Sequence, residues 1–313
     1  MPAIMTHDFF GKDVYAANES LIGASHDERD AFLLGNQGPD PLFYLVISPR
    51  YKDYFALGSD MHHIAPSELL AALKESLCVL EPDERAIGRA YALGFLCHYT
   101  LDRAMHPFVY SQQFAICDAG VDGLDNSDGG EVHGEIEREF DEMALYTKLG
   151  CTIRAYKPYR EVLHASDTVL DVVGKMYAFA AMRAYRMFPP RELFGQAVRN
   201  FRRIQHAFYS PGSAKAAAVD AVETRVLRRN HSLYKSMAHR DNPTLVSAFD
   251  NREHAEWENP FTHERSTASF WDIFEAAKPE AAANMRAFSD EAFDEKAARE
   301  LTRGLDFSGE PVE

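Results

Sequence analysis

The sequence predicts an all-α fold, and three observations support this prediction. Apolar residues recur at helical spacing through most of the chain. Proline, glycine and acidic residues mark the points where helices begin and end. The 313 residues contain no convincing period-2 strand pattern, internal repeat or low-complexity tract. The composition, 46% hydrophobic and 26% charged, is typical of a globular protein and excludes a disordered, collagen-like or coiled-coil chain.

Proline and glycine divide the first half of the chain into helices. Residues 27–35 begin with acids and end at a glycine, which is typical of a short helix. Residues 36–44 contain a glycine and two prolines, so no helix is expected there. A long helix is predicted to stop at His106-Pro107 because proline disrupts a helix interior. The predicted helices are 27–35, 67–80, 83–105 and 131–148, with a loop rich in glycine and aspartate at 111–130.

The second half continues the helical pattern. A polar connection at about 239–266 separates two sets of helices. The predicted helices are 166–187, 190–207, 212–238, 268–288 and 290–303. No segment has the composition of an interdomain linker, so we expect one domain. It consists of a helical core at 1–155 and a C-terminal helical extension at 156–313 packed on that core.

Charge and targeting signals narrow the class of protein. Lysine and arginine total 33 and aspartate and glutamate total 48, so the formal net charge is 33 − 48 = −15. This acidity disfavours non-specific binding to anions, so no stable nucleic-acid partner is expected. The N-terminus lacks the apolar core of a signal peptide, and no run approaches the about 20 apolar residues of a transmembrane segment. Four cysteines without a C-x-x-C pair indicate no disulfide scaffold, and Cys97 is predicted to be a core residue. We expect a soluble, cytoplasmic protein; the sequence does not indicate its oligomeric state.

Three potential metal ligands share one face of the helix predicted at 83–105. His98, Asp102 and His106 lie at i, i+4 and i+8, so their side chains project from the same side of a helix. A rise of about 1.5 Å per residue places His98 and His106 about 12 Å apart along the axis. One zinc ion, with ligand bonds of about 2.0–2.2 Å, is unlikely to hold both histidines. The spacing therefore points to more than one metal ion.

A second pair of ligand types lies on the helix predicted at 131–148. His133 and Glu137 are four residues apart, so both side chains lean over the same turn. One such pair alone is more often an ordinary helix-surface feature, but two pairs, one of them extended in register, are much less expected by chance. Asp40 and one of His62 or His63 add ligands from loops, although singly they fit a turn former and surface polar residues. The spacing does not decide between the two adjacent histidines.

Together with Thr6-His7 near the N-terminus, these motifs form an ordered set. The set resembles the zinc-dependent phospholipase C family, whose fold is shared with the single-strand-specific zinc nucleases. The resemblance covers roughly residues 1–150, and its pieces are Thr6-His7, Gly38-Pro39-Asp40, Met61-His62, His98-x3-Asp102, His106-Pro107 and His133-x3-Glu137. It implies a compact helical domain that holds three zinc ions at the bottom of a cleft.

The resemblance also implies a role for each motif residue. Asp40, His62, His98 and Asp102 would bind one zinc ion, and His62 is preferred over its neighbour because His63 can fill the aromatic-like position that follows the family's ligand. A second ion would be bound by His106, His133 and Glu137. His7 and a bridging Asp102 would hold a third ion, and Asp40 would also orient or deprotonate the attacking water.

Two features depart from the family pattern. Secreted members use a free N-terminal tryptophan as a zinc ligand, whereas this chain begins Met1-Pro2. Their Asp-x5-His spacing is Asp102-x3-His106 here, which keeps helical register but shifts the second site. We therefore expect the protein to bind two to three zinc ions.

The sequence hypothesis is a zinc-dependent phosphoric-ester hydrolase, phospholipase C-like, that cleaves a phosphodiester such as a phospholipid on the headgroup side. Metal ions suit this chemistry because both the phosphodiester and the attacking hydroxide are anionic. A nuclease, a nucleotidase or a small soluble phosphodiesterase with the same metal site is the alternative within this chemistry. A non-catalytic metal-binding protein is the alternative of another class.

Overall fold

The computed structural model describes residues 3–119, 125–209, 211–212 and 238–313. Within these residues the chain is mostly helical, which confirms the all-α prediction. The α-helices are α1 (Ile4–Ile22), α2 (His26–Gly35), α3 (Leu57–His63), α4 (Pro66–Glu75), α5 (Arg85–Cys117), α6 (Gly129–Leu149), α7 (Pro158–Glu161), α8 (Asp167–Tyr185), α9 (Leu193–Phe208), α12 (Phe270–Ser289) and α13 (Glu295–Thr302). The 3₁₀ helices are η1 (Asp40–Ile47), η2 (Pro49–Tyr54), η3 (Ser76–Val79) and η4 (Asn126–Asp128), and one short hairpin joins β1 (Trp257–Glu258) to β2 (Arg265–Ser266).

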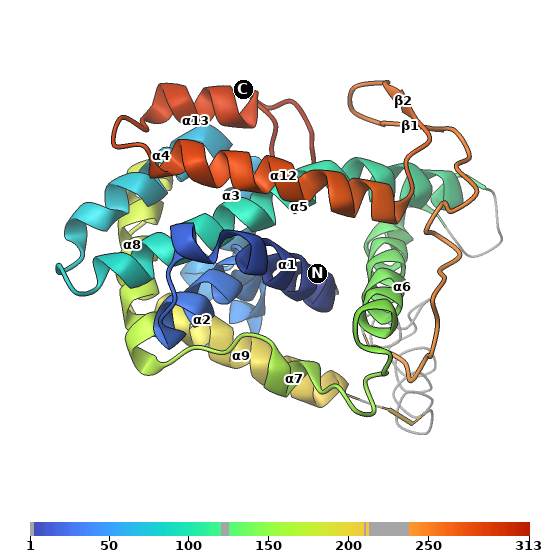
Figure 1. The fold of residues 1–313 in the computed structure, drawn as a ribbon, viewed down its shortest axis with the longest axis horizontal. Helices are drawn as coiled ribbons and strands as arrows, with labels where there is room; N and C mark the ends of the chain where they lie inside the picture. The colour runs from blue at the N-terminus through green and yellow to red at the C-terminus, as the bar shows by residue number, and fades with distance from the viewer. Residues whose placement is uncertain (1–2, 120–124, 210, 213–237) are drawn as a thin grey trace.

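Helix α5 runs through the centre of the molecule, with α2 packed on it and α12 alongside it (Figure 1). The prediction that it ends at His106-Pro107 is wrong, because the helix continues to Cys117. A proline in a helix interior destabilises by about 3 kcal/mol. Phe108 and Val109 follow it and are both 1% exposed. Burying two such side chains contributes about 1.5–3 kcal/mol each, which outweighs the local cost of the proline.

Three other segments differ from the sequence prediction. Helices α1, α3 and α7 were not predicted. The region expected to be non-helical contains the start of η1, because Pro41 stands in the first turn, where the missing N–H has no helical partner anyway. The predicted loop at 111–130 is shorter than expected, since α5 extends to Cys117 and α6 begins at Gly129. The helix predicted at 212–238 lies outside the described residues, apart from its two end positions.

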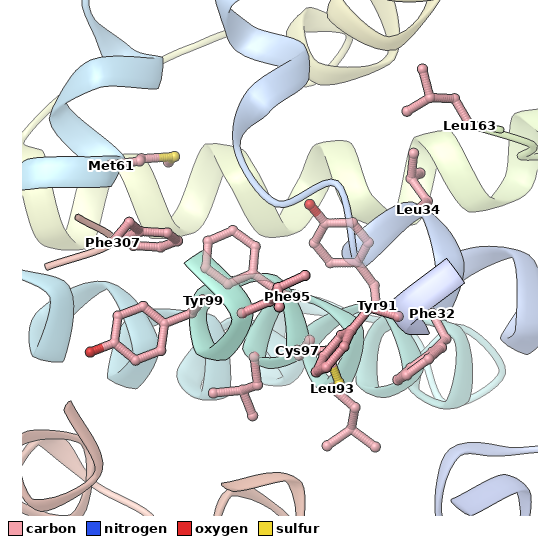
Figure 2. Packing of buried hydrophobic residues seen from close by; sticks show 14 of the residues in the cluster. Phe32, Leu34, Met61, Tyr91, Leu93, Phe95, Cys97, Tyr99, Leu163 and Phe307 are labelled. Atoms are coloured by element: carbon pink, nitrogen blue, oxygen red, sulfur yellow. The ribbon is translucent and has the colours of Figure 1, made fainter. Parts of the chain in front are cut away.

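Buried aromatic and aliphatic side chains along α5 form the core beside the candidate site. Figure 2 shows Phe95 and Tyr99 of α5 with Phe307, which comes from the far end of the chain. The Phe307 ring lies 5.0 Å from the Tyr99 ring and 5.9 Å from the Phe95 ring, between ring centroids, and is fully buried. Cys97 is also fully buried in this cluster, as the sequence predicted.

Described helices after residue 155 pack on the helices of the first half. Helix α12 lies along α5, and α13 lies against α4. After α13 the chain returns to α5, where the Tyr99 hydroxyl donates a hydrogen bond of 2.7 Å to the Leu305 carbonyl. The C-terminal residues therefore lie close to the face of α5 that carries His98, Asp102 and His106. Among the described residues, no helix combines the length and the apolar character needed to cross a lipid bilayer.

Candidate metal centre

The eight predicted metal ligands converge from five helices. Helix α5 contributes His98, Asp102 and His106 from one face, as their spacing predicts. The other ligands are His7 from α1, Asp40 from η1, His62 from α3, and His133 and Glu137 from α6. Their potential ligand atoms form three groups, each close enough to hold one metal ion.

The first group consists of His7, His98 and Asp102, and all three residues are buried. One oxygen of the Asp102 carboxylate lies 3.0 Å from Nε2 of His7, and the other lies 3.2 Å from Nε2 of His98. Asp102 thus lies between the rings of His7 and His98. Its second oxygen also lies 4.0 Å from Nδ1 of His106, so the carboxylate faces toward the next group along α5.

The second group consists of Asp40, His62 and His98. Nε2 of His62 lies 3.1 Å from Oδ1 of Asp40, and Nε2 of His98 lies 3.9 Å from the same oxygen. His98 therefore belongs to both groups. The expected set of four ligands around one ion is divided here, because Asp102 lies with His7 and His98 rather than with Asp40 and His62.

The third group consists of His106, His133 and Glu137. One oxygen of Glu137 lies 3.5 Å from Nε2 of His106 and 3.4 Å from Nε2 of His133. His133 and Glu137 are four positions apart on α6, which brings their side chains over one turn. The i, i+8 separation of His98 and His106 places them in different groups, in agreement with the helical rise.

Four of these histidines are held by hydrogen bonds through their other ring nitrogen. Each Nδ1 faces an oxygen, so Nδ1 carries the proton and Nε2 is left free to bind a metal. The acceptors are backbone carbonyl oxygens for three of them: Gly58 for His62 (2.7 Å), Asn36 for His98 (3.2 Å) and Phe307 for His106 (2.8 Å). For His133 the acceptor is the side-chain oxygen of Gln113 (2.9 Å). This pattern of outer hydrogen bonds is the one that orients histidines around a metal ion.

Two buried nitrogen atoms support a bound cation at this place. Nε2 of His98 and Nδ1 of His7 are buried, and neither forms a hydrogen bond with any residue that the structure describes. Burying a polar atom without a partner is unfavourable by about 1–3 kcal/mol, so such atoms are uncommon. In addition, Nε2 of His62 and Oδ1 of Asp40 would present two lone pairs to each other at 3.1 Å unless a proton or a cation lies between them. The residues present fit a metal ion with nitrogen and oxygen ligands.

Electrostatics favours the ionised form of the ligand carboxylates. Burial raises the pKa of Asp102, but the imidazoles of His98, His106 and His7 outweigh this effect and hold the pKa well below its usual value. Burial also raises the pKa of Asp40, where His62 and His98 outweigh it and lower the pKa. Carboxylates that stay ionised at neutral pH are ready to bind a cation.

The third group shows the same balance for a histidine. Burial lowers the pKa of His106, but the carboxylates of Asp102 and Glu137 outweigh it and raise the pKa to about 9. His133 behaves differently, because burial is the larger effect and lowers its pKa. In the metal-free protein, His106 therefore carries a proton at neutral pH that a metal ion must displace.

A cleft with a volume of about 550 Å³ opens onto the three groups. Seven of the eight predicted ligands line it, and His98 lies beneath them, fully buried. Phe43 and Tyr110 add aromatic surface to the walls. Among the described residues, no lysine or arginine lines this cleft. Positive charge for an anionic ligand would therefore come from bound metal ions and histidines.

The structure distinguishes the two adjacent histidines that spacing left open. His62 is 7% exposed and belongs to a metal group, whereas His63 turns toward the C-terminal segment. Nδ1 of His63 lies 2.8 Å from Oδ2 of Asp306, a carboxylate that is fully buried. His63 still lines the cleft, so it is available to a bound substrate.

Three supporting residues were not predicted from the sequence. Gln113 lies seven positions after His106, on the same face of α5. It falls in the segment predicted to be a loop, because the sequence predicts that the helix stops at His106-Pro107. Asp141 lies four positions after Glu137 and accepts hydrogen bonds from the backbone N–H groups of Met5 and Thr6. This spacing repeats the one between His133 and Glu137, so it was a usable signal. Phe307 had no such signal, because it lies 201 residues from His106 along the chain.

Comparison of the chain with protein-family models, with curated proteins and with solved structures gives no match. The arrangement of the ligand groups around the cleft is therefore the basis for the function proposed next.

Proposed function

We propose that this protein is a zinc-dependent phosphoric-ester hydrolase, phospholipase C-like, that cleaves a phosphodiester. The observation that carries this proposal is the convergence of eight His, Asp and Glu side chains, in three groups of which two share His98, at the floor of one cleft. A single structural zinc site is closed and needs about four ligands. A set of eight that lines an open cleft fits a multinuclear catalytic site better.

The ligand types support zinc as the metal. Neutral imidazole nitrogens and carboxylate oxygens are ligands that zinc binds readily, whereas sites for magnesium or calcium are dominated by oxygen. Five of the eight candidate ligands are histidines. When bound, zinc would neutralise the phosphoryl oxygens and make an attacking water more acidic.

Asp40 is the proposed general base. Its carboxylate lines the cleft, and the low pKa of Asp40 keeps it ionised at neutral pH. Oδ1 of Asp40 lies 3.1 Å from Nε2 of His62, on the side where a metal ion would bind, and Oδ2 is left to accept a proton from water. His63, Tyr110 and Ser308 also line the cleft and offer polar groups to a phosphate ester.

The cleft walls favour a substrate with one phosphate and uncharged or apolar neighbours. Oligonucleotides carry repeated charges and are usually bound by lysine and arginine. No such residue lines the described cleft, whereas Phe43 and Tyr110 offer surface to apolar groups. A phospholipid or another small phosphodiester fits these walls better than a nucleic acid does.

Metal analysis and a substrate panel test the proposal. Purified protein is expected to contain two to three zinc ions per chain. It is expected to hydrolyse a short-chain diacyl phospholipid or bis(p-nitrophenyl) phosphate, and chelation should abolish the activity. Less than one zinc ion per chain, with activity unaffected by chelators, would contradict the proposal. Faster hydrolysis of a single-stranded oligonucleotide would instead favour the nuclease alternative.

An Asp40→Asn variant separates catalysis from metal binding alone. Loss of a general base reduces turnover by about 10²–10⁴-fold, and the variant should still bind zinc at the other groups. Asp53→Asn is the matched control, because Asp53 is exposed and does not line the cleft. Equal activity in the wild type and in Asp40→Asn, or no activity in either, would favour a non-catalytic metal-binding protein.

A further inference from the structure

Residues 305–309, here called the C-terminal strap, contact ligands of two different metal groups. The peptide groups of Phe307 make both contacts. Its N–H donates a hydrogen bond of 3.1 Å to the carbonyl oxygen of His62. Its own carbonyl accepts a hydrogen bond of 2.8 Å from Nδ1 of His106. One residue thus links His62 on α3 to His106 on α5, which belongs to the third ligand group.

We propose that the C-terminal strap is a positioning element of the metal centre. By accepting the proton of His106 Nδ1, it fixes the tautomer that leaves Nε2 free for a metal, and it holds the backbone of His62 in place. This inference rests on the proposed metal site and adds that two of its groups depend on a segment far away in the sequence. Outer hydrogen bonds of this kind typically change metal affinity by about 10–100-fold.

The side chain of Phe307 reinforces these backbone contacts. Its ring is fully buried, with its centroid 5.0 Å from the ring of His62 and 5.8 Å from that of His98. Figure 2 shows the ring beside Phe95 and Tyr99 of α5. The strap therefore limits the movement of two ligand rings. It contacts His62 through a backbone hydrogen bond and through packing, and it contacts His98 through packing alone.

The strap has its own internal support, which is needed if it is to hold other residues. Oδ1 of Asp306 accepts hydrogen bonds from the N–H groups of Ser308 (2.7 Å) and Glu310 (3.0 Å). Oδ2 of the same carboxylate pairs with His63 at 2.8 Å. Tyr99 anchors the beginning of the strap through the Leu305 carbonyl. Asp306 is fully buried, so these hydrogen bonds are shielded from water.

Gly309 places the strap against α5 at the proline of that helix. Pro107 has no N–H, so the carbonyl of Arg103 lacks its usual helical partner, and the strap backbone approaches there. Gly309 has a φ of +75°, and a Cβ built on it would lie 2.8 Å from Pro107 Cγ and 2.9 Å from the Arg103 carbonyl oxygen. An alanine at this position would force the strap away from α5.

The test compares Gly309→Ala with Gly150→Ala. Gly150 also has a positive φ, of +63°, but a Cβ built on it meets nothing within 4 Å. The two variants therefore share the strain of a left-handed alanine and differ in the displacement of the strap. Zinc affinity of metal-stripped protein is measured by competition with a chromophoric chelator, and circular dichroism gives the melting temperature. We expect Gly309→Ala to bind zinc at least about 10-fold more weakly, and Gly150→Ala to match the wild type.

Nuclear magnetic resonance of the histidine rings gives a readout that a merely structural role would not move. In the zinc-loaded wild type, His106 is expected to show a slowly exchanging Nδ1–H signal, because this proton is bonded to the buried strap. Gly309→Ala should lose that signal. If Gly309→Ala fails to fold, Asp306→Ala, which removes the acceptor of the Ser308 and Glu310 N–H groups that supports the strap, replaces it with the same two measurements.

The possible results separate this inference from the proposed function. A folded Gly309→Ala or Asp306→Ala protein with wild-type zinc affinity and an unchanged His106 signal overturns the strap inference alone. A wild-type protein that binds no zinc overturns both. Weaker zinc binding in the strap variants, with Gly150→Ala unaffected, supports the inference.

Discussion

The carboxylate of Asp102 lies between two histidines, with one oxygen 3.0 Å from Nε2 of His7 and the other 3.2 Å from Nε2 of His98. Because the two oxygens point to different rings, one side chain can serve two metal positions. The buried imidazoles hold the pKa of Asp102 well below its usual value, so no proton competes for it near neutral pH. Asp102 is therefore the residue through which the loss of one side chain should affect more than one ion.

The first prediction concerns Asp102→Asn. The amide keeps the size of the side chain but removes its negative charge, and its nitrogen cannot bind a cation. We expect the variant to lose at least one zinc ion per chain and to bind the remainder with more than about 100-fold lower affinity, which exceeds the usual effect of an outer hydrogen bond. Inductively coupled plasma mass spectrometry and chelator competition measure both quantities.

The matched control for Asp102→Asn is Asp30→Asn. Asp30 also follows a histidine by four residues on a helix. Its Oδ2 lies 3.4 Å from Nδ1 of that histidine, His26. That histidine side chain is 85% exposed, and the pair does not line the cleft. Retention of full zinc content in both variants would contradict the bridging role of Asp102.

The second prediction concerns proton release on metal binding. The pKa of His106 is about 9 in the metal-free protein, because Asp102 and Glu137 outweigh the effect of burial. At pH 7.5 His106 is therefore mostly protonated, and a zinc ion at the third group must displace that proton. Isothermal titration calorimetry in two buffers of different ionisation enthalpy should show about one proton released at this group, and zinc affinity should rise with pH up to about 9.

The same pKa shift affects the stability of the metal-free protein. The folded-state pKa of His106 lies above its unfolded value of about 6.5. Its contribution to stability is therefore fully present below about pH 6.5 and is lost as the pH rises through about 9. A His106→Gln variant should show a smaller loss of stability over this pH range in urea unfolding, whereas His26→Gln should behave as the wild type.

The third prediction concerns the anchoring of α1. Asp141 is fully buried and accepts hydrogen bonds from the N–H groups of Met5 (3.0 Å) and Thr6 (2.6 Å), and from the Thr6 hydroxyl (2.7 Å). Nε2 of His239 also lies 2.8 Å from Oδ2 of this carboxylate. Asp141→Ala leaves these buried donors without a partner, so we expect a loss of about 2–4 kcal/mol in the free energy of unfolding.

Asp141→Ala also distinguishes between anchoring and general destabilisation. Because Thr6 precedes His7, the variant should weaken zinc binding at the group of His7, His98 and Asp102. The third group, which contains no residue of α1, should keep its affinity. Phe288→Ala, which truncates a buried side chain that belongs neither to the cleft lining nor to a ligand group, provides a control with a comparable loss of stability. Unchanged zinc binding in folded Asp141→Ala would show that the anchor does not position His7.

Helical spacing predicted that the candidate ligands on α5 share one face, and likewise those on α6, because this spacing depends only on local geometry. His98, Asp102 and His106 are fixed relative to one another by the turns of a single helix, whatever the rest of the chain does. Asp40 and one of His62 or His63 could be named from the sequence only as weak loop candidates, and the choice of His62 relied on a resemblance. Their approach to His98 depends on the packing of η1 and α3 against α5, which no short-range pattern encodes.

Residues that complete the site from a distance could not be predicted. Gln113 was not predicted because a proline usually ends a helix. Here α5 continues past Pro107, since the side chains that follow it are buried. Phe307 was missed for a different reason. It acts through its peptide groups, which every residue except proline possesses, so its identity carries no information about the hydrogen bonds to His62 and His106.

The last prediction concerns the wall of the cleft and tests whether the substrate carries apolar groups. Phe43 and Asp40 lie three residues apart on η1, so their side chains share one face of this 3₁₀ helix. The Phe43 ring lines the cleft, with its centroid 5.1 Å from that of the His62 ring. Phe43→Ala should therefore remove apolar contact from a substrate chain that passes over the metal ligands. Loss of about 1.5–3 kcal/mol of burial corresponds to a decrease of about 10–100-fold in kcat/KM. We expect this decrease for a diacyl phospholipid and little change for bis(p-nitrophenyl) phosphate.

Phe188→Ala is the control for Phe43→Ala, because Phe188 is 74% exposed and does not line the cleft. Equal decreases for both substrates would instead indicate that Phe43 supports His62 and that the substrate's apolar groups do not contact it.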